Sequence, residues 1–98
     1  MARGEAGFSV GGRTLLLRPS FAALVVAEGE LGPLLALADR AAEGRVLLSE
    51  MTALIWHCIA ERDGLAREDI GEALVAQGVG AALPALRAIL RQVLVGSA

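Results

Sequence analysis

Residues 47–62 read L-L-S-E-M-T-A-L-I-W-H-C-I-A-E-R and contain the only Trp, His and Cys of the chain. One side of this stretch carries apolar residues at the spacing of an α-helix: Met51, Leu54, Ile55, Cys58 and Ile59. More apolar surface lies round the other side, so such a helix must be covered on nearly every face. The stretch therefore predicts the central helix of a small domain, from about Glu50 to Arg62. Ser49 is expected to cap its start and Gly64 to stop it.

The segment before this helix begins with the pattern of a β-hairpin, over residues 5–18. A Gly-Gly pair at 11–12 supplies a two-residue turn between two runs of alternating apolar residues. Pairing across this turn sets Phe8 opposite Leu15 and gives the hairpin one apolar face: Phe8, Val10, Leu15 and Leu17. Leu16 is left on the opposite face. A lone hairpin is barely stable in water, so helices are expected beneath it.

Two short helices are expected between the hairpin and the central helix. Ser20 can cap the first, which begins at Phe21. Its predicted inner row is Phe21, Leu24, Val25 and Glu28. A glycine-containing break at 29–32 precedes Pro33, which is a favourable first residue for the second helix. That helix is expected to end near Gly44 and to bury one row: Leu34, Leu37, Ala38 and Ala41.

Two further helices are expected after the central one. The first covers residues 66–78 with Ala66 at the cap position, and its predicted inner residues are Ile70, Ala73 and Leu74. The last covers residues 82–95, with Pro84 in its first turn. Its predicted apolar row is Leu83, Leu86, Leu90 and Val93 or Leu94, widened by Ile89. Arg87 and Arg91 lie four residues apart on a solvated side.

These elements predict an α+β fold that is mostly α: an N-terminal β-hairpin followed by a compact bundle of four to five short helices over residues 20–95. A chain of 98 residues suits a single domain, residues 1–98. Leu, Val and Ile together number 29, which is more than a domain of this size easily hides. We therefore expect some apolar surface to face a partner.

The charge and composition argue against several classes of protein. The formal net charge is −2 with both signs interspersed, so the basic face of a nucleic-acid binder is missing. No stretch reaches the roughly 18 uncharged apolar residues of a transmembrane helix. A single Cys and an N-terminus without a signal peptide indicate a soluble protein of the cytoplasm.

His57 and Cys58 are the only pair that suggests nucleophilic catalysis. Adjacent residues of a helix point about 100° apart, so His57 is poorly placed to act as a base for Cys58. Cys58 also lies on the apolar side, where a thiol behaves as a small inert hydrophobe. One His and one Cys cannot supply the three or four ligands of a metal site. No catalytic residue, cofactor or metal is predicted.

Three residues are candidates for partner binding: Trp56, Glu28 and Leu16. Trp is common at interface hot spots, although core packing explains a sole Trp equally well. Glu28 continues an apolar row, where it either pairs with an Arg or caps a groove. Leu16 lies on the outer face of the hairpin. The edge of that hairpin could accept another strand, and an apolar groove is expected beside Trp56.

Two segments, together with the leading hairpin and the terminal V-L-V-G, resemble a known family. The first is Phe21-x-x-Leu24-x-x-x-Glu28, followed by a glycine-containing break and L-L-A-L-A-D-R. The second is Ile55-Trp56-His57-Cys58-Ile59-Ala60, followed by Gly64-Leu65, R-E-D-I-G and a Gly near 78. From about residue 6 to residue 96 the chain resembles the small tail assembly chaperones of bacterial gene transfer agents and related phage.

The resemblance implies a non-enzymatic protein, with no catalytic residues to carry over. Such a protein would bind the long hydrophobic tape measure protein, keep it soluble and help the tail tube protein polymerise around it. Neither nucleic acid nor a membrane is an expected partner, and a homo-oligomer is an option. Two alternatives stay open: a structural tail component that polymerises by edge pairing, and a small enzyme that uses Cys58 and His57.

Overall fold

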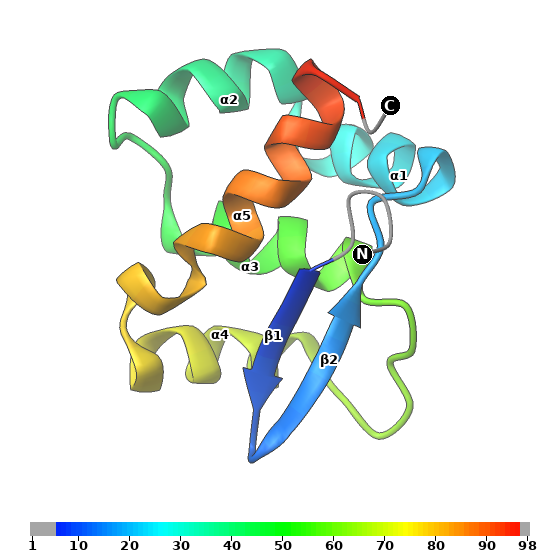
Figure 1. Ribbon diagram of the computed structural model, residues 1–98, viewed down its shortest axis with the longest axis vertical. Coiled ribbons are helices and arrows are strands. Elements are labelled where there is room, and N and C mark those ends of the chain that lie inside the picture. Colours follow the sequence, from blue (N-terminus) through cyan, green and yellow to red (C-terminus); the bar gives the residue numbers. More distant parts are fainter. Residues whose placement is uncertain (1–5, 97–98) are drawn as a thin grey trace.

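The computed structural model describes residues 6–96, in which a two-stranded hairpin precedes five helices. The elements are β1 (Ala6–Val10), β2 (Arg13–Leu17), α1 (Phe21–Leu31), α2 (Leu34–Ala42), α3 (Leu48–Cys58), α4 (Arg67–Gln77) and α5 (Val79–Leu94). Helix α3 packs against α1, α4 and α5, so the predicted central helix is central. Figure 1 shows α5 running between α2 and the hairpin. The predicted α+β, mostly α fold is confirmed.

The hairpin has the predicted register. Phe8 pairs with Leu15 and Val10 with Arg13. Gly11 and Gly12 make the turn with φ values of 57° and 80°, which only glycine adopts without strain. One face is buried through Phe8, Leu15 and Leu17, whereas Leu16 on the other face is 42% exposed. The described strands begin at Ala6, so the first predicted hairpin residue, at position 5, lies outside the described residues.

Helix α3 begins earlier than predicted. Leu47, not Ser49, occupies the N-cap position, and its side chain cannot accept a hydrogen bond. The carboxylate of Glu50 instead reaches back and accepts from the Leu47 amide at 2.9 Å. A carboxylate in the first turn also faces the positive end of the helix dipole. Glu50 thus caps the start of α3, a role that the sequence analysis had assigned to Ser49.

The end of α3 was predicted at Arg62. This prediction was wrong, because the helix ends at Cys58, where the backbone begins to form hydrogen bonds with β2. The Arg18 amide donates to the Cys58 carbonyl at 2.6 Å, and the Ala60 amide donates to the Leu16 carbonyl at 3.0 Å. Between these bonds Leu17 and Ile59 form an antiparallel bridge. The backbone of residues 58–60 therefore occupies part of the β2 edge that the sequence left open for another strand.

The predicted inner row of α1 was also wrong. Phe21 is 84% exposed and Val25 is 49% exposed, and Glu28 is exposed as well. The residue that α1 buries completely is Ala27. Apolar residues occur on every side of the sequence F-A-A-L-V-V-A-E-G-E-L, so helical spacing does not select a face. Tertiary packing selects the side with the small residue, which lets α1 approach the core closely.

Helices α2 and α4 follow their predicted patterns, whereas the predicted apolar row of α5 is buried at Leu86, Ile89 and Leu90 but exposed at Leu83 and Leu94. In α2 the predicted row is buried at Leu34, Leu37 and Ala38, and in α4 at Ile70 and Leu74. Helix α5 begins at Val79, three residues before the predicted start, because Gly78 makes the connection alone at a φ of 87°. Pro84 consequently lies inside α5 and not in its first turn.

Taken one at a time, the helices described within residues 6–96 are all too short or too polar to cross a bilayer. Helices α1 and α2 reach the required length and composition only as a pair, and the chain bends by 75° between them.

Candidate functional site

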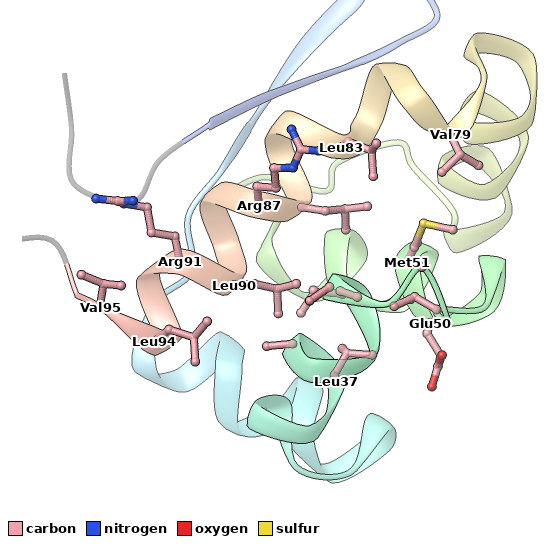
Figure 2. Close-up of a pocket in the computed structure, with 17 residues that line it drawn as sticks. Leu37, Glu50, Met51, Val79, Leu83, Arg87, Leu90, Arg91, Leu94 and Val95 are labelled. Atoms are coloured by element: carbon pink, nitrogen blue, oxygen red, sulfur yellow. The ribbon is translucent and has the colours of Figure 1, made fainter.

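An apolar groove of about 610 Å³ lies between α2 and α5, above α3. Met51 and Leu54 of α3 line its base, and Leu37 of α2 lines one wall. The other wall is built by one side of α5: Val79, Leu83, Leu86, Arg87, Leu90, Arg91 and Leu94. Figure 2 shows Leu83, Leu90 and Leu94 pointing from α5 toward the side of the groove where Leu37 and Met51 lie.

The leucines of the α5 wall differ in exposure, and the most exposed of them lies at its C-terminal end. Leu90 is 9% exposed, Leu83 is 37% exposed and Leu94 is 57% exposed. Leu83, Leu90 and Leu94 repeat at intervals of seven and four residues, so they share one stripe. The stripe lies at the margin of the buried face of α5, which is centred on Ala82, Leu86 and Ile89 in the core. Water-exposed leucines in a concave surface are typical of an interaction site.

The acidic group at the groove is neutralised within the protein. Arg40 of α2 binds Glu50 of α3 with two parallel hydrogen bonds, Nη1 to Oε1 at 2.9 Å and Nη2 to Oε2 at 2.7 Å. This guanidinium, together with the Leu47 amide, lowers the pKa of Glu50 to about 2. Glu50 stays ionised at neutral pH, and its charge is balanced by Arg40.

Two arginines stand on the outer rim of the groove. Arg87 and Arg91 are exposed and lie one helical turn apart on α5. Figure 2 shows both side chains projecting from the rim, away from Leu37. Neither forms an ion pair with another residue between positions 6 and 96. The groove is therefore apolar inside and positively charged along one edge.

A second charged cluster ties three helices together near the C-terminal end of α3, about two turns beyond Glu50. Glu30 of α1 accepts from Arg67 of α4, at 2.6 Å from Nη1 and 3.0 Å from Nη2. The same carboxylate contacts Nε2 of His57, of α3, at 2.8 Å. The hydrogen bonds from Arg67 and then from His57 lower the pKa of Glu30 to about 2. Glu30 is ionised, so it accepts from both partners.

His57 has little freedom to do chemistry in this cluster. A carboxylate only accepts hydrogen bonds, so Nε2 must carry the hydrogen that Glu30 receives. The other ring nitrogen, Nδ1, is buried without a hydrogen-bond partner in the described part of the chain. Cys58 is buried, and desolvation raises the pKa of its thiol to about 11. A thiol with this pKa is almost entirely protonated at neutral pH and is a poor nucleophile.

The three residues predicted to bind a partner lie on separate elements, and none of them lines the groove. Trp56 is half-buried near the end of α3, where the Arg62 guanidinium lies 4.8 Å from its ring centroid. Leu16 is exposed on the outer face of β2. Glu28 accepts from the Leu34 amide at 3.0 Å and so caps α2, instead of pairing with an arginine or closing a groove.

A smaller hollow of about 430 Å³ lies near Trp56, between α1 and the chain that follows α3. Two residues close to Trp56, namely His57 and Arg62, line this hollow, but Trp56 itself does not. The larger groove lies instead over Met51 and Leu54, which the sequence did not single out for partner binding. The assignment of Trp56, Glu28 and Leu16 to a partner surface stays a prediction.

Sequence reasoning missed both the main groove and the role of Glu30. The α5 row carried a usable signal, because four leucines and two arginines fall on adjoining stripes of one helix. No comparable signal marks Glu30, which lies 37 residues from Arg67 and 27 from His57. Across residues 6–96, no three His, Cys, Asp or Glu side chains are grouped to hold a metal ion.

Comparison with known protein families gives a match over nearly the whole chain. A family model described as phage tail tube protein, GTA-gp10, matches residues 3–96. No curated protein gives a significant match to the chain, and no solved structure does.

Proposed function

The chain belongs to the family described as phage tail tube protein, GTA-gp10, and from this membership we propose that it is a tail assembly chaperone. In this role it binds the tape measure protein, keeps its apolar segments from aggregating and helps the tail tube assemble around it. The role is non-enzymatic. The observation that carries the proposal is the open apolar groove between α2 and α5.

The groove suits a protein that shields apolar segments of another chain. Its base and walls are mainly aliphatic, and two leucines of its α5 wall remain exposed to water, Leu83 to 37% and Leu94 to 57%. Burying apolar surface contributes roughly 25 cal/mol per Å² removed from water, so covering this wall favours association. A groove without a chemically active side chain in its lining binds a partner and does not transform it.

Co-expression with the tape measure protein encoded in the same gene cluster tests the proposal. We expect the soluble fraction of the tape measure protein to rise several-fold when this chain is present. Leu94→Glu should abolish the increase, because a carboxylate would then stand in the groove. Val75→Glu is the matched control, since Val75 of α4 is 68% exposed and lies outside the groove.

Two outcomes would count against this function. If the tape measure protein is equally soluble with and without the chain, the chaperone proposal fails. If Leu94→Glu and Val75→Glu protect equally well, the groove is not the binding surface. Circular dichroism of both variants verifies that each remains folded.

The second candidate is a structural tail component present in many copies, and the words "tail tube protein" in the description of the matching family favour it. Edge pairing through β2 is impeded, because residues 58–60 already bond to that strand. On β1, the Gln77 side chain donates to the Ser9 carbonyl. Quantitative mass spectrometry of purified tails separates the candidates: many copies per tail indicate a structural component, and absence indicates a chaperone.

A further inference from the structure

The walls of the main groove restrict the kind of segment that can occupy it. Most of the lining belongs to α2, α3 and α5, whose backbone amides and carbonyls are bonded within each helix; Gly44 and Val46 add a short stretch of the connection between α2 and α3. Along the helical walls an extended peptide would bury its own backbone groups without partners, which is costly. A helix satisfies its own backbone and offers only side chains. The groove therefore suits an α-helix.

The length of the leucine stripe on the α5 wall sets the length of that helix. From Leu83 to Leu94 the stripe covers 11 residue steps, which is about 16 Å of helix at 1.5 Å per residue. A partner helix of about three turns spans this distance. Its contacts would come from apolar residues repeating at three- and four-residue intervals, the spacing that the α5 leucines themselves show.

The charges on the groove determine the polar flank of the partner. The lining includes three charged residues: Glu50, Arg87 and Arg91. Glu50 is neutralised by Arg40, so the net charge offered to a partner is positive and lies on the α5 rim. Arg87 and Arg91 are one turn apart, and guanidinium groups bind carboxylates with two parallel hydrogen bonds. Two acidic side chains one turn apart on the partner would match them.

We propose that the groove binds an amphipathic helix of about three turns whose apolar face is flanked by two carboxylates one turn apart, paired with Arg87 and Arg91. The apolar face packs on Leu83, Leu90 and Leu94, and the carboxylates fix its register and direction. This inference rests on the proposed function, because the bound helix is the segment that the chaperone shields. It defines which segments of a long apolar protein the groove selects.

Two fluorescent helical peptides of about 18 residues test the proposal against the purified full chain. Both carry one leucine face, and they differ only at two flanking positions four apart, which are Glu in one peptide and Lys in the other. Fluorescence anisotropy gives their dissociation constants for three proteins: the wild type, the Arg87→Glu, Arg91→Glu double variant and an Arg13→Glu, Arg62→Glu control. The two variants carry the same net charge, but Arg13 and Arg62 lie outside the groove.

We expect the wild type to bind the Glu peptide at least about tenfold more tightly than the Lys peptide, or about 1.4 kcal/mol. The groove double variant should prefer the Lys peptide, and the control should keep the wild-type preference. The same ratio of affinities in all three proteins would overturn the proposal, and so would the absence of binding. Added salt should bring the wild-type affinities for the Glu and Lys peptides closer together, because the paired charges are exposed.

A second copy of the chain is the competing occupant. Sedimentation velocity of the wild type and of Leu94→Glu decides this point: a dimer that Leu94→Glu dissociates would assign the groove to self-association and overturn the proposal. The peptide experiment and the co-expression experiment test different claims. If the ratio of affinities for the two peptides is the same in all three proteins, the acidic partner helix is ruled out but the chaperone role is not. If the tape measure protein is not protected in co-expression, only the chaperone role is ruled out.

Discussion

The two ends of α3 have different surroundings. Toward its C-terminal end, called the sealed side below, Ile55 and Cys58 are buried at 0% and 1% exposure. Toward its N-terminal end, called the open side or groove side, Met51 and Leu54 are also buried but form the base of a groove whose α5 wall stays partly exposed. One helix with apolar residues on nearly every face thus provides both the core and the floor of a docking site.

The ion pairs of the sealed side join more helices than those of the groove side. On the sealed side Glu30 joins α1, α3 and α4 through His57 and Arg67. On the groove side Arg40 and Glu50 join α2 only to α3, and no ion pair among the described residues holds α5. Apolar residues of α5 that are buried in the core position its wall over the groove. The sealed side should therefore govern stability, and the open side should govern binding.

Truncation on the sealed side should have the largest effect. Ile55→Ala removes three carbon atoms from a completely buried position, and the residual cavity should lower the free energy of unfolding by about 2–5 kcal/mol. Urea denaturation measures this loss. A loss below about 1 kcal/mol would show that the site collapses around the smaller side chain and that the sealed side is less rigid than its burial indicates.

The Cys58 thiol provides a second measure of the sealed side. Its pKa is raised to about 11 and it is buried, so alkylation by iodoacetamide at pH 8 should be at least about 100-fold slower in the folded chain than in urea. A Ser49→Cys, Cys58→Ala variant is the control, because position 49 is exposed and should react at once. Rapid, selective reaction of native Cys58 would revive the enzyme alternative.

Acid should weaken both ion-pair clusters. Glu30 and Glu50 have folded-state pKa values lowered from 4.5 to about 2. Their stabilisation is therefore complete above about pH 4.5 and is lost as the pH falls through about 2. Glu50→Gln should lower the free energy of unfolding by about 1 kcal/mol at pH 7. Glu30→Gln should lower it by less than Ile55→Ala does. Between pH 5 and pH 2 each variant should lose less stability than the wild type in urea titrations; an equal loss would contradict the assignment.

Truncation on the open side should have the smallest effect on stability. Leu94 is 57% exposed, so Leu94→Ala should change the free energy of unfolding by no more than about 0.5 kcal/mol. Binding of the helical peptide should nevertheless weaken, because the leucine side chain is part of the groove wall. A large loss of stability with unchanged binding would reverse the roles assigned to the two sides.

The sequence predicted the features that depend on nearby residues. The hairpin register follows from its two-glycine turn and alternating pattern, and α4 begins and ends where its local signals indicate. The buried rows of α2 and α4 follow from their spacing. These features require only the period of a helix or strand and the chemistry of a turn.

The features that depend on distant residues could not be predicted in the same way. The end of α3 at Cys58 is imposed by β2, about 40 residues earlier in the chain. The inner face of α1 is chosen by packing, because its sequence is apolar all round. Glu30 has an ordinary local setting and gains its role only when α4 brings Arg67 to it. Local pattern carries no information on such pairings.

The strand nearest the N-terminus packs against the last described helix, which affects how the chain folds during synthesis. Strand β1 contacts α5, and Ser9 accepts a bond from Gln77, 68 residues later. The hairpin is synthesised before α5 and has no α5 to pack on until that helix has been translated. Closing so long a loop is entropically costly, and contacts between distant residues form late. The apolar face of the emerging hairpin should therefore need protection until α5 is available to cover it.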